Sequence, residues 1–282
     1  MIPPASPRPA DLPDFEAPPV SEVVLSIQFA SVPRFRSLYV GGIWDEFRDE
    51  FPNVTEQAPI DPTFETFGAS ARPPQSFQVF MTPPMPRFWF ETKDGVELIQ
   101  IQQDRMVHNW RKRELSQHYP HYEPFRNRFA SEITKFDDFL VAKELGSIKP
   151  NQCEVAYINT ITIPDATDPH AHLERITPLW LGQQSEPFLP RLENATVQAQ
   201  YVLRKDEKAF GRVHVNFTPM LQSSDNAPMI QLTILARGKP DEESLESAFQ
   251  LLDREREIIV RTFAAVTSKE MHAFWRRKDN AK

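Results

Sequence analysis

The sequence predicts an α+β fold in which one large antiparallel sheet packs against long helices. Two observations lead to this expectation. The order strand, short helix, group of strands, long helix occurs twice along the 282 residues. The predicted strands also alternate apolar and polar residues, which is typical of sheets with one face on a core. We therefore expect a duplicated unit, with halves at residues 20–150 and 151–282 behind a tail of residues 1–19.

The tail and the N-terminal half come first in the chain. Seven prolines in residues 1–19 predict an extended tail, either disordered or laid along a neighbouring surface. Alternation predicts strands at residues 22–29, 64–67, 76–80, 87–91, 96–103 and 106–110. Helical spacing predicts a short helix at residues 37–50, before Pro52. The long helix is predicted at residues 121–145, where Gly146 supplies the stop.

The C-terminal half repeats this order. Strands are predicted at residues 153–163, 195–204, 210–218 and 229–236. A short helix is expected at residues 172–182. The last helix is predicted at residues 241–266, with Asp241 as its N-cap and an apolar stripe that Arg256 interrupts. The segment at residues 271–277 is expected to dock on the fold or to continue this helix.

Composition narrows the classes of function. The net charge of −7 disfavours unspecific binding of duplex nucleic acid. The single cysteine, Cys153, excludes an intramolecular disulfide and lies in an apolar run that favours an inert thiol. The sequence lacks a secretory signal and an apolar stretch of about 18 residues, so we expect a cytoplasmic protein without a membrane segment. Glycine-rich phosphate-binding motifs are absent, and no cofactor is predicted.

Residues 98–113 are the richest candidate for a binding surface. Ile99 and Ile101 would face the helices, which leaves the alternating glutamines on the open side of the sheet. Amide, aromatic and arginine side chains together can stack on and hydrogen-bond a base, a sugar or a peptide. The predicted binding residues here are Gln100, Gln102, His108, Trp110, Arg111 and Arg113. The alternative is a solvated sheet face with a half-buried tryptophan.

A second polar set is predicted on the C-terminal strands. Its members should share one face, whereas their apolar neighbours face the core: Thr196, Gln198, Gln200, Arg212, His214, Asn216, Gln231 and Thr233. Uncharged amides and hydroxyls outnumber lysine and glutamate here, which favours a wetted groove or a protein interface. Arg212 and His214 are the predicted binding residues of this half. An ordinary solvated outer face is the alternative.

The histidines suggest metal or hydrolase chemistry, but neither prediction is favoured. One segment carries four candidate metal ligands: Asp168, His170, His172 and Glu174. Asp168 more simply stabilises a turn, so no metal site is assigned. His108 with His121 or His214 could form an acid–base pair, and the alternative function is therefore an RNA- or nucleotide-processing enzyme. No diagnostic hydrolase, zinc-protease or redox motif is present, and no catalytic residue is assigned.

Two resemblances extend these expectations. The repeated element order resembles TATA-binding-protein-like and helix-grip domains, although a fold does not fix a function. Four segments resemble the signature of a sporadically distributed, uncharacterised bacterial family: PPVSEVVLSIQF, LIQIQQDRMVHNWRK, YPHYEPF and YINTITI, which begin at residues 18, 98, 119 and 157. The block QxQxDR…NWRK is the most specific of these. The resemblance implies a cytoplasmic bacterial protein with an accessory role, such as defence or toxin neutralisation, and it transfers no catalytic residue.

The favoured prediction is a non-enzymatic binding protein. Its open sheet face would bind a partner protein or a small polar ligand. A third hypothesis, nucleic-acid binding by a saddle-like duplicated sheet, is disfavoured by the acidic balance. Exposed strand edges are compatible with a homodimer.

Overall fold

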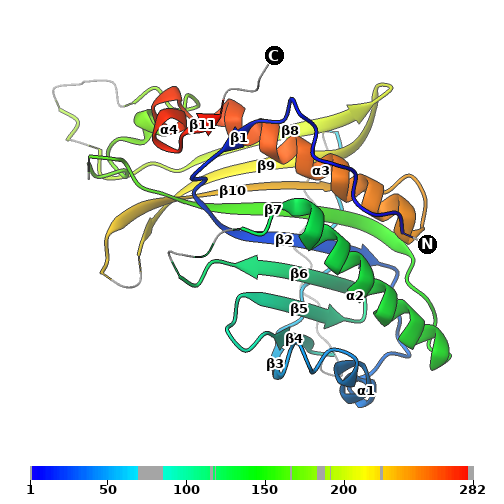
Figure 1. The fold of residues 1–282 in the computed structure, drawn as a ribbon. Coiled ribbons are helices and arrows are strands. Elements are labelled where there is room, and N and C mark those ends of the chain that lie inside the picture. Colours follow the sequence, from blue (N-terminus) through cyan, green and yellow to red (C-terminus); the bar gives the residue numbers. More distant parts are fainter. Residues whose placement is uncertain are drawn as a thin grey trace.

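One antiparallel sheet of nine strands runs through both halves of the chain (Figure 1). The computed structural model describes residues 2–68, 85–114, 117, 119–165, 167–182, 188–190, 192–222 and 225–278. Across the sheet the order is β3 (Asn53–Gln57), β4 (Arg87–Glu91), β5 (Glu97–Gln102), β6 (Arg105–Arg111), β2 (Val20–Phe29), β7 (Pro150–Ile161), β10 (Pro228–Gly238), β9 (Lys208–Leu221) and β8 (Val197–Lys205). The sequence-based prediction of an α+β fold with a large antiparallel sheet packed on helices is therefore confirmed.

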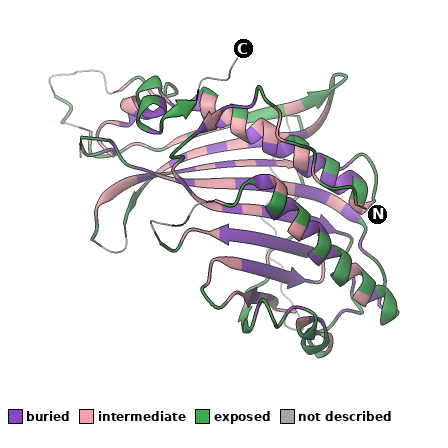
Figure 2. Cartoon of the chain, in the orientation of Figure 1, coloured by how far each residue is buried: buried purple, intermediate pink, exposed green. Residues whose placement is uncertain are grey.

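Two long helices cover one face of this sheet, α2 (Tyr122–Ala142) and α3 (Leu245–Val266) (Figure 1). Their apolar stripes and the apolar side of the sheet form the core, so the middle of the sheet is buried (Figure 2). The ring centroids of Phe129 on α2 and Phe249 on α3 lie 5.6 Å apart, which joins the helices over the core. Burial of each such side chain contributes about 1.5–3 kcal/mol.

The two halves correspond in how their strands pair. In each half the opening strand pairs with the last strand before the long helix, β2 with β6 and β7 with β10. β2 and β7 then pair with each other and join the halves in one sheet. Among the described residues, the N-terminal half contributes one strand more to this sheet. Descent of both halves from one duplicated unit stays a prediction.

Several elements differ from the sequence-based expectation. The helix expected at residues 37–50 is a 3-10 turn (Ser37–Tyr39) followed by α1 (Val40–Asp45), where two adjacent glycines lower helix propensity. The one expected at residues 172–182 is a single 3-10 turn, Leu173–Arg175, because Pro178 disfavours helical backbone at the residue before it. The strand expected at residues 64–67 is absent, β3 was missed, and residues 76–80 lie outside the described residues.

The last helix begins later than predicted. Asp241 is not its cap, since α3 starts at Leu245 and the Ser244 side chain accepts a hydrogen bond of 3.2 Å from the Ser247 backbone amide. The segment after α3 forms a separate helix, α4 (Lys269–Phe274), so it docks rather than continues α3. Among the described residues, no helix combines the length and the apolar character needed to cross a membrane.

The proline-rich tail lies on the fold, the second of the two predicted alternatives. Arg126 of α2 donates a hydrogen bond of 2.6 Å to the Pro3 carbonyl, and Leu12 is buried. Further along, β1 (Asp14–Phe15) pairs with β11 (Arg277–Lys278) in a separate two-stranded sheet. The tail therefore forms part of the helix-covered side of the molecule.

Candidate functional site

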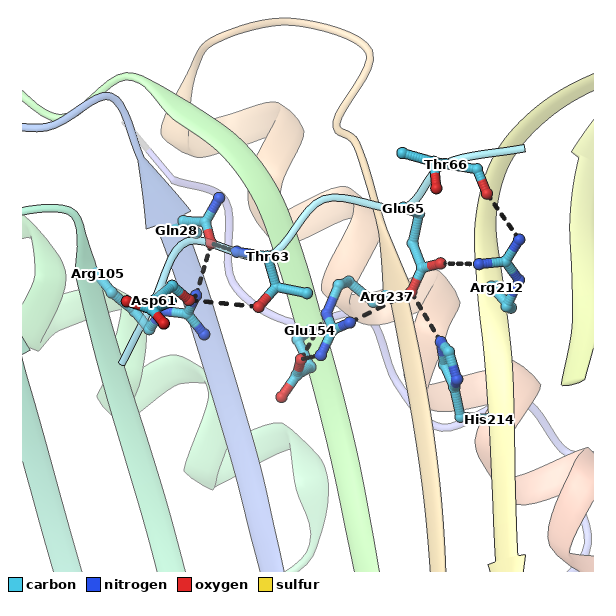
Figure 3. Close-up of polar contacts among 10 residues, drawn as sticks. All are labelled: Gln28, Asp61, Thr63, Glu65, Thr66, Arg105, Glu154, Arg212, His214 and Arg237. Carbon is cyan, nitrogen blue, oxygen red and sulfur yellow. Dashed lines mark hydrogen bonds and ion pairs between the residues drawn. The ribbon is translucent and has the colours of Figure 1, made fainter. Parts of the chain in front are cut away.

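The sheet face opposite the helices is crossed by an extended segment, residues 60–67, which we call the strap. Figure 3 shows the strap passing over neighbouring strands, with sheet side chains directed toward it. This face carries the polar residues of the alternating strands, because cross-strand pairing places them together. The predicted C-terminal set follows this pattern: Gln198 pairs with Asn216, and Thr233 lies opposite Asn216 on the other side.

The N-terminal part of the strap is held by amide side chains of the sheet. The backbone amide of Ile60 donates to Gln102 Oε1 (3.1 Å), and Gln102 Nε2 donates to the Ile60 carbonyl (2.8 Å). Gln28 Oε1 accepts from the Thr63 amide (2.8 Å) and from Arg105. The sheet side chains thus satisfy strap backbone groups much as a neighbouring strand would.

The C-terminal part of the strap is held through one carboxylate. Glu65 forms ion pairs with Arg212 and Arg237, the latter at 3.3 Å, and its Oε1 lies 2.7 Å from His214 Nε2 (Figure 3). Arg212 and His214 come from β9, and Arg237 comes from the adjacent β10. The Glu65 side chain is 5% exposed, whereas those of Arg212, His214 and Arg237 are 14–20% exposed, so water reaches the donors more than the carboxylate. Three donors from two strands therefore converge on a single carboxylate.

Electrostatics keep this carboxylate ionised. Burial by itself would raise the pKa of Glu65, but the hydrogen bond from His214 and the charges of His214, Arg237 and Arg212 outweigh it. The pKa of Glu65 is therefore lowered from its ordinary value. Glu154 of β7 pairs with Arg237 (2.7 Å), which adds a second carboxylate at the edge of the cluster. The cluster thus holds one ionised carboxylate, that of Glu65, by charge and hydrogen bonds.

The strap has little apolar anchoring. Its two aromatic side chains, Phe64 and Phe67, are 54% and 38% exposed. Phe67 lies over the Arg212 guanidinium at 5.2 Å. Polar and ionic contacts dominate the attachment, and water can replace such contacts at low net cost when both partners are solvated.

The structure corrects the predicted N-terminal binding surface. His108 and Trp110 do not lie on an open face: they point toward the helices and are 0% and 3% exposed. The register explains this, because His108 pairs with Ile99 and therefore shares its apolar side. Gln100 and Gln102 do lie on the opposite face, but they are 7% and 5% exposed and so are not open either.

Neighbouring polar groups and the strap cover these glutamines. Gln100 accepts from Arg87 (2.6 Å) and from the Trp89 indole (3.1 Å). Arg111 and Arg113 both pair with Glu91, the latter at 3.3 Å. These side chains form a layer of hydrogen bonds and ion pairs on the N-terminal strands, in which the Nε atoms of Arg87 and Arg111 are buried without a partner among the described residues.

The histidines have separate roles. His108 is enclosed between Glu97 and Glu132 and cannot reach a substrate. It therefore cannot be one of the two acid–base residues of the enzymatic hypothesis. His214 binds Glu65, and His121 is exposed at the start of α2. His170 contacts the Met220 carbonyl at 3.0 Å.

The histidine segment considered as a candidate for metal binding is held by local contacts. Asp168 accepts from the His170 amide at 2.9 Å, as the predicted turn requires. His172 contacts Glu174 at 3.1 Å. Over the described ranges, no group of three or more histidine, cysteine, aspartate and glutamate residues is placed to hold a metal ion.

Sequence reasoning missed Glu65, Arg237 and Arg105. Arg237 continues the alternation of Gln231 and Thr233 along one strand, so extending that pattern by four residues would have found it. Glu65 lies in a proline-rich segment without periodicity, and nothing in the sequence assigns it a partner 147 positions away.

No protein-family model matches the chain, and no match is found among curated protein sequences.

Proposed function

We propose that this chain is a non-enzymatic binding protein that captures an extended, acidic segment of a partner protein on the sheet face now covered by the strap. The partner segment would place a carboxylate between Arg212, His214 and Arg237, where Glu65 lies. The observation that carries the proposal is the convergence of these three side chains on one carboxylate. The strap would act as an internal competitor.

Charge and backbone contacts support a peptide as the ligand. Arg105, Arg212 and Arg237 bring positive charge to this stretch of the face. Gln28 and Gln102 bind backbone groups of the strap, so they can serve any extended peptide irrespective of its side chains. Specificity would come from the carboxylate, through charge-assisted hydrogen bonds.

The strap is suited to exchange because its contacts with the sheet are mainly polar. Its exposed phenylalanines contribute little buried apolar area, so release sacrifices little hydrophobic stabilisation. The sheet side chains it would uncover are amides and guanidinium groups, which water solvates well. A competing acidic peptide would then replace one set of hydrogen bonds by an equivalent set.

Competition with a synthetic strap tests the proposal. The probe is a labelled peptide of residues 58–68, APIDPTFETFG, and the measurement is fluorescence anisotropy. Glu65→Gln should weaken the internal strap and increase peptide affinity about tenfold over the unsubstituted chain, the effect of one charge-assisted hydrogen bond. Arg212→Met added to Glu65→Gln should abolish this gain.

Two controls make the result specific. A peptide with glutamine in place of its glutamate should bind neither protein well. Arg204→Met, at an exposed arginine of β8 that donates to the Glu207 carbonyl (2.9 Å), should leave peptide binding unchanged. Equal affinity of the peptide for Glu65→Gln with and without Arg212 would refute the proposal.

The remaining parts of the hypothesis concern biology and assembly. We propose an accessory cellular role such as defence or toxin neutralisation, in the cytoplasm, on the resemblance alone. Among the described residues, β3 and β8 are the edge strands of the sheet, and such edges can pair with a second copy. Light scattering of the purified chain measures whether a homodimer forms.

A further inference from the structure

A cavity of about 310 Å³ lies on the other side of the sheet, among the helices. Its walls come from β2, β7, the start of α2, the middle of α3 and the docked tail, and its volume falls in the range of small-molecule sites. The lining residues that matter here are Tyr119, Tyr122, Tyr157, Asn159, Arg256 and Phe263. The cavity is therefore separate from the strap and its cluster.

Aromatic rings form much of this lining. Tyr119 and Tyr157 meet edge to face with centroids 5.9 Å apart, and their hydroxyl oxygens are 3.3 Å apart. Phe15 of the tail and Phe263 of α3 pack edge to face at 5.3 Å. Such a lining suits a flat aromatic ring, which can pack by its faces and edges.

One buried cation lines the same cavity. Arg256 is 4% exposed, lies over the Tyr122 ring at 5.1 Å and pairs with Glu123 at 3.1 Å. Its Nε atom is buried and has no hydrogen-bond partner among the described residues. An unpaired buried N–H costs free energy, so a ligand acceptor that satisfied this guanidinium would be favoured.

The lining has two further features. Arg8 and Lys278 also belong to it, and Lys278 pairs with Asp14 at 2.7 Å. His121, also in the lining, has φ of +70°, an unfavourable backbone conformation for a residue with a Cβ atom. Strain of this kind is frequent at ligand sites, where the surrounding structure holds it.

We propose that this cavity binds a small aromatic carboxylic acid, with its ring among the tyrosines and its carboxylate at Arg256. The tyrosine hydroxyls are donors at neutral pH, because the ordinary pKa of a tyrosine is about 10, and burial raises the pKa values of Tyr119 and Tyr157 further. The site lies opposite the proposed peptide surface, so each can be tested without the other.

Calorimetric titration of the full chain with benzoate and 4-hydroxybenzoate tests the proposal, with neutral benzamide as the matched probe. Benzoate should bind, and benzamide should bind at least about tenfold more weakly because it lacks the charge that pairs with arginine. Val260→Phe, which fills the cavity from α3 without removing a polar group, should abolish benzoate binding. Arg256→Met should weaken it about tenfold or more.

Arg254→Met is the control on the same helix. Arg254 stacks on Phe210 at 4.2 Å and is not part of the cavity lining, so its loss should leave benzoate affinity unchanged. If Arg256→Met does not fold, Val260→Phe decides, with its melting temperature as the check on folding. The proposal is overturned if the unsubstituted chain binds neither acid at concentrations of about 1 mM, or if Val260→Phe binds benzoate as well as the unsubstituted chain does.

Discussion

His108 Nδ1 on β6 lies 2.7 Å from a carboxylate oxygen of Glu132 on α2, and both side chains are buried. The second ring nitrogen, Nε2, lies 3.0 Å from Glu97 on β5. Burial would lower the pKa of His108, but the charges and hydrogen bonds of Glu132 and Glu97 outweigh it and raise the pKa to about 9. A charged imidazolium therefore ties the sheet to α2 beneath Phe125, whose ring centroid is 4.6 Å away.

We expect this imidazolium to make stability depend on alkaline pH. The folded pKa is raised from 6.5 to about 9, so the contribution is complete below 6.5 and is lost as pH rises through about 9. A shift of this size corresponds to about 3 kcal/mol. Urea unfolding between about pH 6 and pH 10 should show this fall, and His108→Gln should remove it. An equal alkaline loss of stability in both proteins would contradict the assignment.

Trp110→Ala should destabilise the fold. Trp110 is 3% exposed and packs against Tyr119 with ring centroids 5.4 Å apart. Removal of a buried tryptophan side chain costs about 3–5 kcal/mol. Arg113→Ala, on the same segment but with a 46% exposed side chain, should change the free energy of unfolding by about 0.5 kcal/mol or less. Chemical denaturation measures both free energies of unfolding. A Trp110→Ala variant as stable as the unsubstituted chain would contradict the burial of Trp110.

The fold was largely predictable because alternation and helical spacing are local patterns. The strands at residues 87–91 and 96–103 flank a short turn, and the structure has β4 and β5 there. The prediction that His108 and Trp110 lie on the open face of the sheet was wrong. Alternation shows only which residues of one strand share a side. The pairing of His108 with Ile99 decides that their side is the one that meets the helices.

The candidate site was only partly predictable. Arg212 and His214 were chosen because they share a polar strand face, and they do lie on one face. Their partner Glu65 sits in a segment whose conformation comes from long-range side-chain contacts, which leave no periodic signal. The cavity was not predictable for the same reason. Its walls come from segments far apart in the sequence, and they meet only because the tail docks on the helices.

Loss of the Glu65 charge should loosen the strap without unfolding the chain. Chymotrypsin cleaves after aromatic residues, and the strap presents the exposed Phe64 and Phe67. Glu65→Gln should therefore be cut in this segment about tenfold faster, as expected for loss of one charge-assisted contact. Asp61→Asn is the matched control, because Asp61 accepts hydrogen bonds from Thr63 and Arg105 through its backbone carbonyl, which the substitution keeps. Equal cleavage rates for the two variants would argue against Glu65 as the strap's anchor.

Glu255→Leu should stabilise the protein at neutral pH. Glu255 on α3 is 0% exposed, and neither carboxyl oxygen has a hydrogen-bond partner among the described residues. Burial, followed by the negative charge of Glu154, raises its pKa well above the ordinary 4.5, which favours the neutral acid in the folded chain. Ionisation of the unfolded chain then lowers stability as pH rises above 4.5. Leucine cannot ionise in the unfolded chain and has no oxygens to leave unsatisfied. The substitution should therefore raise the free energy of unfolding by about 1–3 kcal/mol at neutral pH, and by less at about pH 4. Glu257→Leu, two residues along the helix and partly exposed, should lack the pH-dependent gain in parallel thermal unfolding. A Glu255→Leu variant less stable than the unsubstituted chain at neutral pH would mean that the carboxyl has a partner, and that its burial serves the fold.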